Sequence, residues 1–305
     1  MIKRNSLDKI IESEYLKYLK KQGISLVKLK NKTSQLKLFY LPICNDIYKT
    51  FIKKRKTILI SLSGAQGTGK TTIAGILKII LKKKFNLEVV TISIDDFYKT
   101  HSQRRKMSNT IHRLFLTRGV PGTHEIPLIK KTLNGFIKKK FKSILLPRFD
   151  KSSDNRYLKK YWYRLKKKPQ IVIFEGWCIS AKHQNDKILR KPINTLEKKN
   201  DIDLVWRKKV NDELKTNYKK IFNLLDKNIF LKVPNFKYVF KWRLLQEKKL
   251  KKGFKGKKIM NYQQIKKFIM YYERITKQML KDYKRTSDIV LKINKRHQID
   301  SIKFF

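Results

Sequence analysis

The sequence has few cysteines, few glycines and prolines, and no long apolar run, and these shortages exclude several classes of protein. Among the 305 residues there are two cysteines, Cys44 and Cys178, with no spacing pattern. Two are too few for a disulfide scaffold or a zinc site, which favours a reducing compartment. The longest apolar runs, such as ILISLSG and IVIFEGW, have the length of a strand and fall far short of the roughly 20 residues of a membrane span. We therefore expect a globular protein without a membrane partner.

Neither an internal repeat nor a linker rich in proline, glycine or serine divides the chain. The first residues, MIKRNSLDKIIESEYLKYLKK, have no apolar signal core and carry acidic residues early. We interpret them as an amphipathic helix of a cytoplasmic protein, not as a targeting peptide. Residues 1–54 are expected to form a helical extension packed on the core, and residues 55–305 to form the main domain.

Acidic residues are also scarce, with 23 Asp and Glu against 76 Lys and Arg, so the net charge is +53. Such a charge can indicate a nucleic-acid partner, because Lys and Arg neutralise phosphates. Here the lysines spread over the whole chain beside abundant Ile and Asn, as a bias toward A/T-rich codons would produce. We favour the compositional explanation and expect no nucleic-acid partner. In either case the positive field attracts anionic substrates.

Apolar strands alternate with helices along most of the chain. Strands are expected at 57–63, 87–95, 143–146, 171–175, 229–233 and 288–293, and helices at 7–21, 38–54, 70–83, 124–140, 203–226, 236–252 and 261–283. A polar segment at 101–123 precedes the fourth of these helices, 147–157 is expected to be a loop, and 253–258 a glycine/lysine hinge. Because the main strands are apolar throughout, we predict an α/β fold with three αβα layers and a five-stranded parallel sheet. Ligands of such sheets bind at the carboxyl ends of the strands.

The stretch SGAQGTGKTTI, from Ser63 to Ile73, matches the phosphate-binding pattern G-x-x-x-x-G-K-[ST]. Glycines let the backbone curl until its N–H groups point at phosphate oxygens, and the helix that begins near Lys70 adds its dipole. Lys70 is expected to reach the β- and γ-phosphates of ATP, and the Thr71 hydroxyl to bind Mg²⁺. The predicted nucleotide site comprises Gly64, Ala65, Gln66, Gly67, Thr68, Gly69, Lys70, Thr71 and Thr72.

Carboxylates follow the next two main strands. The segment SIDDFYKT places Asp95 and Asp96 at a strand end, where a carboxylate beside the γ-phosphate can accept the proton of a substrate hydroxyl. The segment IVIFEGW places Glu175 at another strand end, where it can position Mg²⁺. The alternatives, a turn or helix cap for the Asp pair and an ordinary strand-end acid for Glu175, remain open.

Signatures of other phosphate-handling classes are missing from the sequence. Glu175 is followed by Gly176 and not by the second acid that many motor ATPases carry. The base-reading NKxD of GTPases and the HRD and DFG motifs of protein kinases are also absent. Phosphoryl transfer to a small acceptor is therefore favoured.

The segments SGAQGTGKTT, SIDDFY, RGVPGTHE, LPRFDKS and FEGW, in this order, resemble the P-loop D-glycerate 3-kinase family, which is related to uridine kinase, phosphoribulokinase and bacterial pantothenate kinase. The resemblance implies ATP- and Mg²⁺-dependent transfer of a phosphoryl group to a hydroxyl of a small anionic acceptor, D-glycerate before the others. Pantothenate or a nucleoside is the alternative acceptor, and a nucleic-acid-dependent ATPase is the alternative from another class.

The resemblance also implies roles for single residues. Asp95 would be the catalytic base, Asp96 would help to hold Mg²⁺ or the acceptor, and Tyr98 would lie near the acceptor. Acceptor contacts would also come from Arg118, His124, Arg148, Asp150 and Lys151. Arg243, in a basic lid at about 236–260, would stabilise the transferred phosphoryl group together with Lys70. A solvated role for Arg118 and a helix-start role for His124 remain open. The sequence departs from the family at Ser180, where a Gly is common, and in SDNRYLKKYWYRLKKK after PRFDKS.

Overall fold

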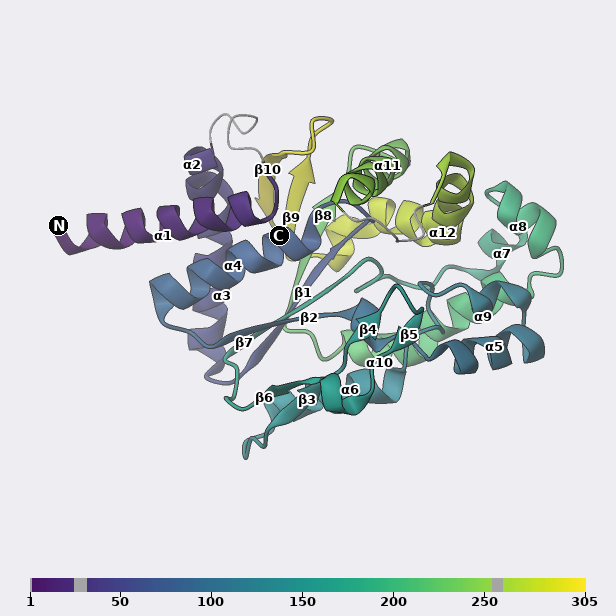
Figure 1. Cartoon of the computed structure of the whole chain (residues 1–305), viewed down its shortest axis with the longest axis horizontal. Coiled ribbons are helices and arrows are strands. Elements are labelled where there is room, and N and C mark those ends of the chain that lie inside the picture. Colours follow the sequence, from purple (N-terminus) through teal and green to yellow (C-terminus); the bar gives the residue numbers. More distant parts are fainter. Residues whose placement is uncertain (1, 25–31, 254–259) are drawn as a thin grey trace.

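The structure, a computed structural model, describes residues 2–24, 32–253 and 260–305 (Figure 1). Its centre is a six-stranded sheet with the order β10-β9-β8-β1-β7-β2. The strands are β1 (Ile58–Gly64), β2 (Val89–Ser93), β7 (Ile171–Gly176), β8 (Lys227–Lys232), β9 (Ile289–Ile293) and β10 (Ile299–Phe304). Five of them run parallel, as predicted, and β10 pairs antiparallel with β9. The sequence analysis missed this sixth, edge strand.

Helices cover both faces of the sheet, which gives the expected three layers (Figure 1). Alternate residues of β1 show the division: Ile58, Ile60 and Leu62 belong to one apolar core, and Leu59 belongs to the other. The first core contains α1 (Ile2–Lys21), α3 (Leu41–Lys54) and α4 (Lys70–Phe85). The second contains α6 (Ile126–Ile137), α9 (Val205–Glu213), α10 (Lys219–Phe222) and α12 (Tyr262–Thr286).

The N-terminal helices lie directly on the sheet-covering helix α4. Ile11, Tyr15 and Leu19 of α1 are buried in the same core as Ile73 and Leu77 of α4. The short α2 (Lys32–Gln35) and a π-helical turn (Leu36–Tyr40) lead into α3. The division at residue 54 into an extension and a main domain stays a prediction.

The remaining α-helices and strands lie outside the six-stranded sheet. They are α5 (His101–Thr110), α7 (Asp186–Arg190), α8 (Thr195–Asn200) and α11 (Phe236–Gly253), with two small hairpins, β3 (Ile144–Leu146) with β6 (Tyr163–Leu165) and β4 (Phe149–Asp150) with β5 (Asn155–Arg156). The expectation of a plain loop at 147–157 was wrong, because β4 and β5 lie within it. The predicted hinge at 253–258 lies, from residue 254 onward, outside the described residues. No helix in the described ranges has both the length and the apolar character to cross a membrane.

Candidate active site

The three sequence motifs meet at one edge of the sheet. In the register of the parallel strands, Ser63 lies beside Gly176, and Ser93 lies beside Glu175. The glycine loop leaves β1, the Asp pair follows β2, and Glu175 ends β7, so neighbouring strands deliver all three to the same place. Ligands bind at such edges in open α/β sheets.

The glycine loop has the form that a phosphate cradle requires. Gly67 and Gly69 have φ values of 77° and 89°, in the left-handed region that favours glycine. The Lys70 ammonium donates to the carbonyl of Ala65 at 3.0 Å, so it points into the loop. Burial lowers the pKa of Lys70, an effect opposed by the carboxylates of Glu175 and Asp95. A half-buried cation in a glycine loop at the start of a helix fits the phosphates of ATP.

The predicted metal ligands lie side by side. The Thr71 hydroxyl donates to Oε1 of Glu175 at 3.0 Å. Glu175 is 8% exposed, and burial raises its pKa, while Lys70 acts in the opposite direction. A hydroxyl and a carboxylate oxygen are hard donors, of the kind that Mg²⁺ prefers, so this pair fits the ion at the start of α4.

Asp95 is held by two side chains from different parts of the chain. The Tyr98 hydroxyl donates to Oδ1 at 2.7 Å, and the Lys151 ammonium donates to Oδ2 at 2.8 Å. Burial alone would raise the pKa of Asp95, but the charge and hydrogen bond of Lys151, with the Tyr98 hydroxyl, lower it well below its usual range. The carboxylate is therefore ionised at neutral pH and oriented beside the phosphate loop.

Tyr98 is itself supported by two buried side chains, His124 and Tyr218, whose contact the sequence does not predict. Its ring stacks on His124 with centroids 4.6 Å apart, and Nδ1 of His124 shares a hydrogen bond of 2.5 Å with the Tyr218 hydroxyl. His124 is fully buried, and burial lowers its pKa to about 3, so the ring is neutral. Its Nε2 has no hydrogen-bond partner among the described residues. This arrangement suits a group that positions Tyr98; the predicted acceptor contact of His124 stays a prediction.

Lys151 sits on the β4–β5 hairpin, and two arginines fix that hairpin. Arg104 is fully buried in α5 and binds Asp154 through its carboxylate and its carbonyl, both at 2.8 Å. Arg118 forms an ion pair with the same carboxylate, and its guanidinium lies over the ring of Phe149 at 5.4 Å. The hairpin thus carries Lys151 to Asp95 and brings Arg118 close to it.

The other predicted acceptor residues contact partners other than Asp95. Asp96 accepts a hydrogen bond from the amide of Phe149 at 3.3 Å, and burial raises its pKa to about 6. Arg148 lies over the ring of Tyr157 at 5.2 Å. Asp150 accepts hydrogen bonds from the amide and hydroxyl of Ser152, which tighten the hairpin turn. For these three residues an acceptor role stays a prediction.

Comparison with known proteins agrees with this geometry. No family model matches the chain. An uncharacterized kinase of Schizosaccharomyces pombe is 31% identical over 239 residues, which are 73% of this chain and 84% of the relative. The chain belongs to the P-loop D-glycerate 3-kinase family. The chloroplastic D-glycerate 3-kinase of Arabidopsis thaliana is 26% identical over 251 residues, 77% of this chain and 52% of that protein. The D-glycerate 3-kinase structure from Cryptococcus neoformans has the same fold, with a TM-score of 0.73 at 22% identity over 87% of this chain and 99% of its own.

In this kinase the helix α11 lies against the phosphate loop. A Cβ added at Gly67 would come within 3.1 Å of the Trp242 Cβ and 3.4 Å of the Arg243 amide nitrogen. The Arg243 guanidinium, however, pairs with Glu247 of the same helix and donates to Gln246 at 2.7 Å. The backbone of the predicted lid is therefore next to the phosphate loop, while the side chain of Arg243 is paired within its own helix. Its catalytic role stays a prediction.

The family departure at Ser180 has a structural explanation. Ser180 has φ of 65°, the left-handed conformation that glycine adopts at low cost. Its hydroxyl donates to Oδ1 of Asn228 at 2.6 Å, and Ser61 donates to the same oxygen at 2.8 Å. The hydrogen bond compensates for part of the backbone strain.

Several supporting residues escaped the sequence analysis: Arg104, Asp154, Tyr218, Trp242 and Glu247. One signal was available for α5, because Thr100 and Gln103 form a capping box at its start. The Tyr218 contact had no local signal, since 94 residues separate it from His124.

Proposed function

We propose that this kinase transfers the γ-phosphoryl group of ATP to a primary hydroxyl of D-glycerate and forms 3-phosphoglycerate. The observation that carries the proposal is the ionised Asp95, held by Tyr98 and Lys151 beside the phosphate loop. The name of the Arabidopsis relative supports the choice of acceptor. The positive field of the chain favours small anions of this kind.

In the proposed reaction, Asp95 accepts the proton of the acceptor hydroxyl while that oxygen forms a bond to the γ-phosphorus. The bond between this phosphorus and the bridging oxygen of ATP breaks, and ADP leaves with the electron pair. Lys70 offsets the charge on the phosphoryl oxygens. Thr71 and Glu175 would hold Mg²⁺, which neutralises phosphate charge when it is bound.

Lys151 and Arg118 would bind the carboxylate of the acceptor, since Lys151 contacts Asp95, Arg118 binds the hairpin that carries Lys151, and an Arg fork suits a carboxylate. When Lys151 turns from Asp95 to the acceptor, the main influence that lowers the pKa of Asp95 weakens. Asp95 then becomes a stronger base at the moment when the hydroxyl is next to it.

The test is ADP release from purified protein with saturating MgATP, with and without D-glycerate, in moderate salt. We expect glycerate-dependent turnover with 3-phosphoglycerate as product. The Asp95→Asn variant should keep MgATP affinity and lose about 10²–10⁴-fold in turnover, the usual contribution of a general base. Asp186→Asn, an exposed change on α7, is the control and should match the wild type.

Two results would overturn the proposal in different ways. Full activity of the Asp95→Asn variant would show that Asp95 is not the catalytic base. No stimulation by D-glycerate, with turnover on pantothenate or a nucleoside instead, would keep the phosphoryl transfer and replace the acceptor. Hydrolysis stimulated only by a polynucleotide would discard the small-acceptor kinase altogether.

A further inference from the structure

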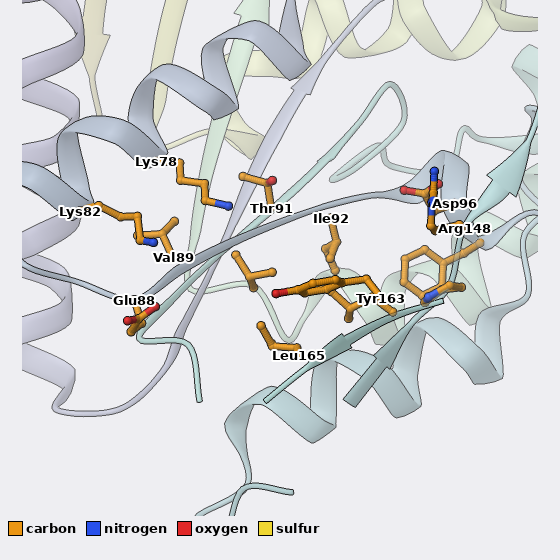
Figure 2. Close-up of a pocket in the computed structure, with 14 residues that line it drawn as sticks. Lys78, Lys82, Glu88, Val89, Thr91, Ile92, Asp96, Arg148, Tyr163 and Leu165 are labelled. Carbon is orange, nitrogen blue, oxygen red and sulfur yellow. The ribbon is translucent and has the colours of Figure 1, made fainter. Parts of the chain in front are cut away.

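A cavity of about 370 Å³ lies along the free edge of β2, outside the cluster formed by Lys70, Asp95 and Glu175 (Figure 2). Strand β2 is the last strand of the main sheet and pairs only with β7, so its other edge is open to this space. The β3–β6 hairpin supplies the opposite wall. The cavity shares Asp96 and Arg148 with the predicted acceptor residues, but Lys70, Asp95 and Glu175 do not line it.

The two ends of the cavity differ in charge. Lys78 and Lys82, one helical turn apart on α4, line one end, and Asp96 and Arg148 line the other (Figure 2). Between them lie the ring of Tyr163 and the side chains of other apolar residues. A cavity of this size, lined by apolar side chains with charged groups at both ends, is large enough for a small molecule.

In the described ranges neither lysine has a carboxylate oxygen within 4.0 Å. Glu88, the acid at the same end, lies 3.9 Å from Lys167 and acts on Lys78 only through its charge. Burial lowers the pKa of Lys78, the like charge of Lys82 lowers it further, and the charge of Glu88 raises it. Two cations held four residues apart on one helix face repel each other, and an anion between them would remove that repulsion.

We propose that this cavity is a second ligand site, which binds a small molecule with a flat apolar body and one anionic group. The anionic group would lie between Lys78 and Lys82, and the apolar body would pack on Tyr163 and Leu165. At the far end, a hydrogen-bond donor of the ligand would meet the carboxyl group of Asp96. The β3–β6 hairpin closes the open side of β2, which favours a compact ligand over an added peptide strand.

The test is a calorimetric titration of the whole protein with anilinonaphthalene sulfonate, a flat aromatic anion, with saturating MgATP to fill the nucleotide site. The double variant Lys78→Glu, Lys82→Glu should weaken binding on the order of tenfold, because it turns both cations into anions. The matched control is Lys49→Glu, Lys53→Glu on α3, which changes two exposed lysines with the same spacing and the same change of charge, outside the cavity. It should change the affinity less than about twofold.

A second variant tests the body of the site without altering charge. Leu165→Trp places a larger side chain in the cavity and should abolish binding while glycerate-dependent or other kinase activity continues. Equal affinity of the wild type and the Lys78/Lys82 variant would overturn the proposal, as would equal losses in both double variants. Absence of probe binding to the wild type would overturn it too. None of these outcomes depends on which acceptor the kinase uses.

Discussion

Replacing Lys151 by Met tests whether this lysine sets the protonation of Asp95. The two charged groups are 2.8 Å apart, so their attraction is about 1.5 kcal/mol in a water-like medium and about 6 kcal/mol at an effective dielectric constant of 20. The side chain of Lys151 is 62% exposed, which favours the lower end of this range. Loss of the ammonium should therefore raise the pKa of Asp95 by at least about 1 unit.

The direction of the expected pKa change follows from the positive charge of Lys151. With Lys151 present, the pKa of Asp95 lies below its usual range, so the base stays ionised through mildly acidic pH. In the Lys151→Met variant the effect of burial is opposed mainly by the Tyr98 hydrogen bond, so the pKa should rise toward the ordinary value of about 3.9. The base then becomes protonated, and kcat/KM falls, as the pH drops toward 4.

The assay is the pH dependence of kcat/KM for the acceptor at saturating MgATP, which reports the ionisation of the enzyme before the acceptor binds. Between pH 7 and pH 4 the wild type should keep a nearly constant kcat/KM, and Lys151→Met should lose about half of it, as a base with a pKa near 3.9 requires. Lys151→Arg keeps the charge and should keep the wild-type profile. Lys160→Met, an exposed change nearby, is the neutral control. A profile of Lys151→Met that superimposes on the wild type would refute the reasoning.

Three further predictions concern other parts of the site. Because burial raises the pKa of Asp96 to about 6, the folded protein binds an extra proton between pH 4 and pH 6, and its stability should fall as the pH rises through that window. The Asp96→Asn variant should not show this fall, and at pH 8 its free energy of unfolding, measured in urea, should be higher by up to about 3 kcal/mol. Gly67→Ala should raise the KM for ATP more than Gly69→Ala. Both substitutions strain the backbone, but only the added methyl group at residue 67 comes close to Trp242. Equal increases of KM in the two variants would contradict this expectation. Ser180→Ala should be about 1 kcal/mol less stable than Ser180→Gly. Both variants lose the hydrogen bond to Asn228, but only alanine keeps the strain of the left-handed backbone. The reverse order of stability in urea denaturation would show that backbone strain at residue 180 does not limit stability.

The parallel core could be predicted because its strands are continuous apolar runs that are buried on both faces. β1 and β7 are buried at every position, and such runs stand out in a basic sequence. Strand β10 could not be predicted in this way. It is an edge strand that is buried only at Ile299 and partly or fully exposed beyond it, and only its pairing with β9 defines it.

Those residues of the site that lie within a sequence motif could be predicted. A phosphate loop fixes its own geometry through local backbone conformation, so Lys70 and Thr71 are found from sequence alone. The clamp on Asp95 depends on contacts between distant segments, such as Lys151 with Asp95, which are 56 residues apart. Helix α5 has only Arg104 buried, so it lacks the apolar stripe by which helices are recognised.

The hairpin that carries Lys151 has a consequence for how such enzymes diverge. Asp154 of this hairpin is bound by Arg104 and Arg118, and Asp96 accepts a hydrogen bond from the amide of Phe149, so residues outside the phosphate loop fix the hairpin. In the proposed reaction, substitutions between Phe149 and Arg156 would therefore change the cation offered to the acceptor while the phosphate loop stays as it is. The departure from the family pattern begins just after PRFDKS and includes Asp154, so it falls on the residue that anchors the hairpin of Lys151.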